Sequence, residues 1–81
     1  MVADVARSPV PDPALAAAIR RLREQRGMTQ EALAFASGIT TGSVARIELG
    51  QSVPGWDTVR QLARGLGVSL AELAAAVESE H

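Results

Sequence analysis

The segment 30–49 constrains the fold of this chain more than any other part of the sequence. Thr29 is a good helix N-cap residue directly before it, and Thr40 is a second one within it. Between them, Gly38 permits the positive φ that a tight turn requires. Small and apolar residues recur where two steeply crossing helices would bury them: Leu33, Ala34, Ile39, Val44 and Ile47. The segment therefore predicts two short helices joined by a sharp turn.

Start and stop signals elsewhere in the chain predict three more helices. Asp12 and Pro13 combine an N-cap with a first-turn proline, and Ser69 with Glu72 forms a capping box. Alanine and leucine are plentiful and β-branched runs are missing, so we expect an all-α fold. Short connections make this a compact five-helix bundle. The expected helices cover about residues 13–26, 30–37, 41–49, 56–66 and 70–78.

The chain is long enough for one small domain, at 81 residues. Residues 1–11 contain Pro9 and Pro11 without helical periodicity, which predicts a flexible arm. Residues 12–78 are predicted to form the domain, and residues 79–81 a frayed C-terminus. No apolar stretch is long enough to span a bilayer, and the N-terminus lacks the continuous apolar region of a secretory signal. We therefore expect a cytoplasmic protein without a membrane association.

Enzyme and metal chemistry have few residues to use in this chain. The only histidine is His81 and there is no cysteine, so neither a Ser–His pair nor a set of metal ligands can be assembled. The sequence GITTGS at 38–43 lacks the GK[ST] ending of a phosphate-binding loop. We expect no enzymatic activity, no catalytic or metal site, no cofactor and no small-molecule ligand.

Basic residues are distributed unevenly along a chain whose formal net charge is −1. All eight are arginines, and the first three predicted helices hold five of them against three glutamates. Arginine suits bidentate recognition of phosphate and guanine. Arg20, Arg21 and Arg26 are expected to form a solvated helix face, with the alternative that one or two of them reach the DNA backbone. Arg60 and Arg64 are expected to pair with acidic neighbours instead of binding DNA.

The paired short helices form a helix-turn-helix, which presents its second helix to the major groove of DNA. Helical periodicity gives this second helix an outward face that consists of Thr41, Gly42, Ala45, Arg46 and Leu49. Arg46 can donate two parallel hydrogen bonds to guanine, and Thr41 can bond to a base or pack on a thymine methyl group. Gln30 lies in the first turn of the preceding helix, where free N–H groups make an anion site.

Residues in four of the five predicted helices and in the turns between the helices match the sequence pattern of a known protein family. They are Arg23, Gly27, Thr29–Glu31, Leu33–Ala34, Gly38–Thr40, Val44, Arg46–Glu48, Gly50, Pro54, Leu62–Ala63 and Leu66–Val68. In this order and at this spacing, they resemble the phage-repressor-like helix-turn-helix family, often called the XRE family, over about residues 14–77. The resemblance implies a lambda-repressor-like five-helix domain. It also implies a sequence-specific transcription regulator that acts as a homodimer on double-stranded DNA.

The same resemblance implies roles for individual residues. The DNA-binding positions it suggests are Gln30, Thr41, Gly42, Arg46, Leu49, Gln51 and Ser52. Gln30 matches a glutamine that touches a phosphate. Thr41, Gly42 and Arg46 match positions that face base edges. Leu49, Gln51 and Ser52 match positions that contact the DNA backbone. Arg23 and Glu48 match an arginine–glutamate pair that links the first helix to the third.

Two departures from the family pattern leave a second function open. Gly42 has no side chain where relatives often carry a base-reading residue, and Leu49 with the neutral loop after it lacks the usual phosphate-gripping residues. Together with the net acidity, these features favour a protein-interaction module, such as an antitoxin or adaptor, with weak or no DNA binding. A DNA-binding assay at low salt separates the two functions.

An apolar stripe on the last predicted helix indicates self-association. It consists of Leu70, Leu73, Ala74 and Val77. A domain of this size is not expected to bury the whole stripe alone, which favours a homodimer. Such a dimer would bind half-sites about 34 Å apart. The alternative is that the stripe only closes the core of the monomer.

Overall fold

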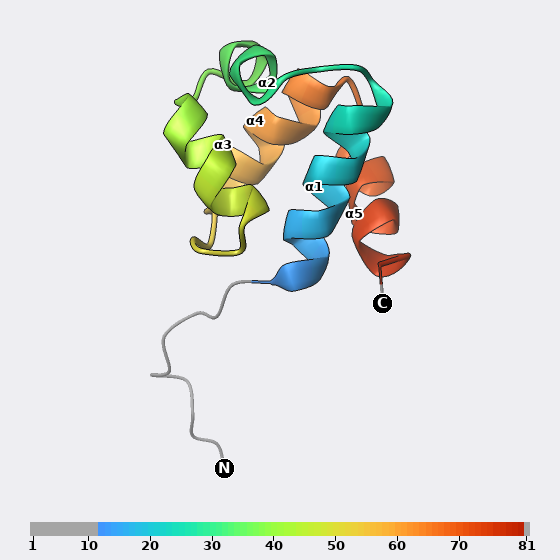
Figure 1. The fold of residues 1–81 in the computed structure, drawn as a ribbon. Coiled ribbons are helices and arrows are strands. Elements are labelled where there is room, and N and C mark those ends of the chain that lie inside the picture. The colour runs from blue at the N-terminus through green and yellow to red at the C-terminus, as the bar shows by residue number, and fades with distance from the viewer. Residues whose placement is uncertain (1–11, 81) are drawn as a thin grey trace.

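The computed structural model describes residues 12–80, which form five α-helices and no strand (Figure 1). The helices are α1 (Pro13–Gln25), α2 (Gln30–Ser37), α3 (Thr41–Glu48), α4 (Trp56–Leu66) and α5 (Leu70–Glu78). The all-α five-helix fold expected from the sequence is confirmed, and each helix lies within one residue of its expected bounds. The arm predicted for residues 1–11 lies outside the described residues, as does His81.

Side-chain caps define where four of the helices begin. Asp12 accepts a hydrogen bond from the N–H of Ala14, Thr29 from that of Ala32, and Thr40 from that of Ser43, at 2.9, 2.9 and 3.1 Å. On α5 the cap is reciprocal, because Ser69 and Glu72 each accept a backbone N–H from the other. Caps of this kind contribute about 0.5–2 kcal/mol each. The bond from the Ser69 N–H also holds the pKa of the Glu72 carboxyl below its usual value.

The turn between α2 and α3 depends on Gly38. Its φ is 73°, in the left-handed region that side chains disfavour. The following N–H, that of Ile39, returns to the Ala34 carbonyl at 3.0 Å and closes the end of α2. The chain is thereby turned so that α3 leaves α2 steeply (Figure 1).

Side chains from all five helices form one core. Its buried members are Ile19, Leu33, Ala34, Val44, Ile47, Leu62, Ala63, Leu66 and Leu73. The predicted inward residues of the two short helices are among them, except Ile39, which is half-buried and packs on the edge. Leu73 is 2% exposed and therefore belongs to the core of the monomer rather than to a free apolar stripe.

The helices α2 and α4 pack tightly against each other at Ser37 and Gly65. A Cβ on Gly65 would overlap the Ser37 Oγ and lie 3.0 Å from the Ser37 backbone nitrogen. The Ser37 hydroxyl is buried and has no hydrogen-bond partner within residues 12–80. The absence of a side chain at Gly65 therefore sets how closely α4 supports the helix-turn-helix, a role that we did not predict from the sequence.

An ion pair ties the end of α5 to α1. The Arg21 Nε donates to the Glu80 carboxylate at 2.6 Å, and its Nη2 lies 3.4 Å from the Ala76 carbonyl and the Ser79 hydroxyl. Arg21 is thus partly exposed but paired with Glu80, a contact that we had not expected of a residue on a solvated helix face. The N–H groups of Ser79 and Glu80 donate to the carbonyls of Ala75 and Val77 at the end of α5.

Candidate nucleic-acid interface

The outward face of α3 is open to solvent, as the helical periodicity predicts. Gly42, Arg46 and Leu49 are exposed, whereas Val44 and Ile47 are buried in the core. Thr41 and Ala45 are half-buried at the edge of this face. A helix held by its inner side and bare on its outer side can be presented to a groove of DNA.

Arg46 is the long polar side chain on this face. Its Nη2 lies 3.5 Å from the Ser43 Oγ, which is too long for a strong hydrogen bond. No acidic side chain of residues 12–80 forms an ion pair with it. The guanidinium is therefore available for a planar acceptor pair such as guanine O6 and N7.

Gly42 is helical, exposed and one turn before Arg46. A Cβ at this position would meet only the Arg46 Nη1, at an ordinary contact distance of 3.5 Å. We therefore expect Gly42→Ala to raise the free energy of unfolding by about 0.5–1 kcal/mol, because alanine loses less backbone entropy in a helix. Urea denaturation measures this, and a destabilised variant would contradict the open environment of Gly42.

A buried carboxylate connects α3 to both preceding helices. Glu48 is 4% exposed and accepts the Arg23 Nε at 2.7 Å and the Arg23 Nη2 at 3.0 Å. The Arg23 Nη1 donates to the Met28 carbonyl at 2.8 Å. The hydrogen bond to Glu48 raises the pKa of the Arg23 guanidinium. The two residues that the family pattern pairs are thus in direct bidentate contact.

Gln30 is the third member of this cluster. Its Nε2 donates to the Glu48 Oε1 at 3.0 Å, and the residue is half-buried. We had expected the Gln30 side chain to face a phosphate and had not predicted its contact with Glu48. A primary amide carries two donor hydrogens, so the second can still reach an anion beside the first turn of α2. The family resemblance suggested a role for Gln30 and a role for Glu48, but the contact between them depends on how α2 and α3 cross.

The loop after α3 offers little charge to a partner. Leu49 is 67% exposed, Gln51 is exposed and Ser52 is half-buried. The N–H of Gln51 is used within the protein, since it donates to the Arg46 carbonyl at 2.9 Å. The three positions at which the family resemblance suggests contacts to the DNA backbone thus lie together after the end of α3. None of them carries a positive charge.

The two arginines of α4 are exposed. Arg60 lies 4.0 Å from Asp57, at the limit of an ion pair, and both side chains are well solvated. Arg64 has no acidic partner within the described part of the chain. The expectation that both arginines pair with acidic neighbours therefore fails for Arg64.

Comparisons with known proteins identify the family. Residues 14–76 match the helix-turn-helix domain family, and the chain belongs to this family. The clp gene regulator ClgR from C. glutamicum is 28% identical, with a TM-score of 0.78 over 89% of this chain and 94% of that one. The restriction-modification controller protein C.AhdI from Aeromonas hydrophila is 33% identical, with a TM-score of 0.73 over 75% and 92%. No curated protein matches.

A further solved structure supports the fold alone. The wild-type restriction-modification controller protein C.Esp1396I is 23% identical and has a TM-score of 0.82 over 90% of this chain and 94% of that one.

The resemblance to XRE-like regulators is confirmed, and the chain is a helix-turn-helix DNA-binding transcription regulator. Among the described residues, no helix has the length and apolar character needed to cross a membrane.

Proposed function

We propose that this chain binds DNA sequence-specifically by placing the outward face of α3 in the major groove. The observation that carries the proposal is an exposed Arg46, without an ion pair among residues 12–80, on a helix whose opposite side is buried. Arg46 reads guanine through two parallel hydrogen bonds, and Thr41 contacts a neighbouring base. Gly42 lets the backbone of α3 approach the groove floor. Gln30 binds a phosphate with the amide hydrogen that Glu48 does not use.

In this proposal, the contacts to the DNA backbone lie at the C-terminal end of α3. Leu49, Gln51 and Ser52 flank the phosphates there, and their neutral character predicts a shallow dependence of affinity on salt. A subunit with few cationic contacts neutralises about 2–4 phosphates, so the slope of log K against log salt is correspondingly small.

We also propose that the chain acts as a homodimer through α5. An apolar groove beside this helix is lined by Leu15, Trp56, Val59, Leu70, Leu73, Ala74, Val77 and Glu78. Trp56 is 65% exposed at its edge, and Ala74 is exposed as well. Burial of this surface between two copies would bring the recognition helices to half-sites about 34 Å apart. Sedimentation at tens of micromolar tests this, and a monomer unchanged by DNA contradicts it.

A selected-site binding profile tests the assignment of Arg46. We expect Arg46→Ala to lose about 1–3 kcal/mol of discrimination between the best site and its single-base variants. Gln30→Ala should weaken all sites by a similar factor, because phosphates are alike on every sequence. Arg64→Ala is the matched control, since it removes an exposed arginine from α4 without touching α3.

The outcomes separate the alternatives. If Arg46→Ala retains the wild-type sequence preference, recognition lies elsewhere, for example in DNA shape. If the wild type retains no duplex from random genomic fragments at low salt, the protein-interaction module is the better description. If Arg64→Ala flattens the preference as strongly as Arg46→Ala, the effect arises from net charge and the assignment is wrong.

A further inference from the structure

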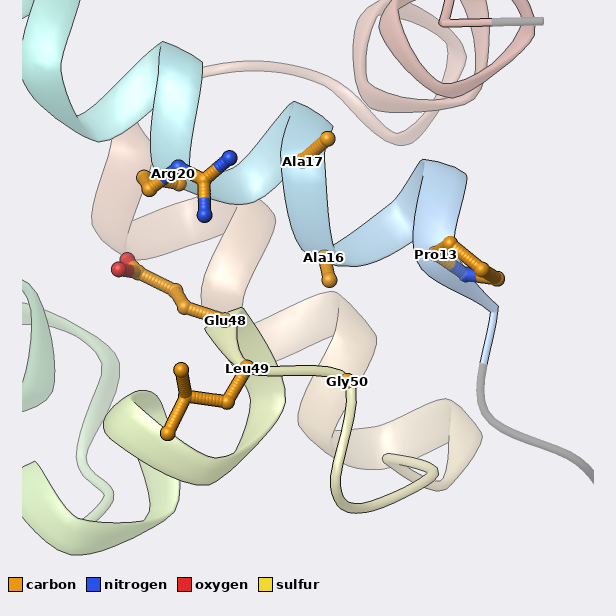
Figure 2. Close-up of a pocket in the computed structure, with 7 residues that line it drawn as sticks. All are labelled: Pro13, Ala16, Ala17, Arg20, Glu48, Leu49 and Gly50. Atoms are coloured by element: carbon orange, nitrogen blue, oxygen red, sulfur yellow. The ribbon is translucent and has the colours of Figure 1, made fainter.

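A groove runs between α1 and the C-terminal end of α3 (Figure 2). It is lined by Pro13, Ala16, Ala17, Arg20, Glu48, Leu49 and Gly50 and has a volume of about 250 Å³. Figure 2 shows the Arg20 side chain extending from α1 and that of Leu49 extending from the end of α3. The walls are thus mostly small or apolar, with one arginine at the rim.

The charge of this groove comes from Arg20. It is exposed, and it forms neither a hydrogen bond nor an ion pair with any side chain in the span 12–80. The neighbouring Arg21 and Arg23 are occupied by Glu80 and Glu48. Arg20 is therefore the arginine of this part of α1 whose guanidinium is left for a partner.

The glutamate in the groove does not cancel this charge. Both oxygens of Glu48 already accept hydrogen bonds, from Arg23 and from Gln30. Its negative charge is balanced by Arg23 at 2.7 Å, and no contact of ion-pair length joins it to Arg20. An anion that enters the groove meets a compensated carboxylate and a guanidinium that has no acidic partner among residues 12–80.

The position of the groove points to its occupant. Leu49 belongs both to the groove and to the outward face of α3, so the groove continues the surface proposed to meet DNA. A base read by α3 is attached to a sugar and a phosphate that pass alongside this face. A sugar–phosphate unit is apolar on its ring carbons and anionic on its phosphate, which matches an apolar wall with a guanidinium at its rim.

We propose that this groove binds one sugar–phosphate unit of the DNA backbone, with Arg20 bonded to the phosphate and Leu49 packed on the deoxyribose. The proposal rests on the proposed DNA-binding function. It explains how a chain whose loop after α3 has no cation can still anchor the end of its recognition helix. The cation is supplied by α1, across the groove, instead of by the loop.

The test compares variants of Arg20, on α1, and of Arg26, the residue that follows α1, across a salt series. Arg20→Gln should weaken binding to the selected site and to random duplex by the same factor. It should also reduce the slope of log K against log salt by about 0.9, the contribution of one phosphate. Arg26→Gln is the control: it removes the same charge from the C-cap residue of α1, which is exposed and does not line the groove. Its slope should stay at the wild-type value.

A third variant tests the apolar half of the groove. Leu49→Ala should weaken both DNAs without changing the slope, because an apolar contact releases no counterion. Thermal melts verify that all variants are folded, which the exposure of the replaced side chains favours.

Three results would overturn the inference. They are an unchanged slope in Arg20→Gln, an equal change in Arg26→Gln, and an altered sequence preference in Arg20→Gln, which would make Arg20 a base reader. If the wild type binds DNA through Arg46 while Arg20→Gln behaves like the wild type, only this inference fails. If the wild type binds no DNA, the proposed function fails with it.

Discussion

Replacement of Arg23 by alanine is expected to lower the free energy of unfolding by about 3–5 kcal/mol, the cost of breaking a buried ion pair. The side chains of Arg23 and Glu48 are only 12% and 3% exposed, so the variant would retain a buried carboxylate without its counterion. Gln30 would still donate one hydrogen bond to this carboxylate, but a neutral amide cannot compensate its negative charge. Urea denaturation measures the loss.

Arg21→Ala provides the matched control on the same helix. Arg21 also donates to a glutamate, but the side chains of Arg21 and Glu80 are 42% and 22% exposed. Water screens a pair of this kind, so its loss should cost about 1 kcal/mol or less. Equal losses for the two arginine variants would show that burial does not set the strength of these pairs.

The second large effect is expected for Gly65→Ala, which should lower the free energy of unfolding by about 1–3 kcal/mol through overpacking. The added Cβ would overlap the Ser37 hydroxyl and press on its backbone, so α2 and α4 would have to separate. The change is the same as in Gly42→Ala, yet the expected sign is opposite, because one glycine faces a helix and the other faces solvent.

Ser37→Ala is the control for this contact. It removes a buried hydroxyl that has no partner in the described range, so we expect a neutral or slightly stabilising change. Ser37→Ala with Gly65→Ala should recover only part of the loss, since the Ser37 backbone nitrogen would still lie 3.0 Å from the new Cβ. A Gly65→Ala variant as stable as the wild type would disprove the close approach.

The helix bounds and the recognition face could be predicted from the sequence because they depend on local patterns. Thr29, Thr40 and Ser69 cap the helices that their positions indicate, and each cap involves residues at most three positions apart. The outward position of Arg46 follows from the helical period alone. Such features need no knowledge of how the helices cross.

The features that the sequence did not reveal depend on distant segments meeting. The contact of Gln30 with Glu48 spans 18 positions, and that of Arg21 with Glu80 spans 59. The role of Gly65 appears only when α4 is placed against α2. The burial of Leu73 likewise depends on α5 packing on the other helices, because its periodicity alone fits an outer stripe equally well.

The Glu48 carboxylate has a consequence for how the protein meets its partner. One side chain of α3 holds Arg23 of α1 and Gln30 of α2, so the three helices cannot slide past one another without breaking a buried hydrogen bond. The separation between the first turn of α2 and Arg46 is thereby set before any partner arrives. The entropy of ordering this surface is lost during folding instead of on binding, so the interface is pre-organised. A rigid spacing also selects for the width of the groove it enters, in addition to the bases within it.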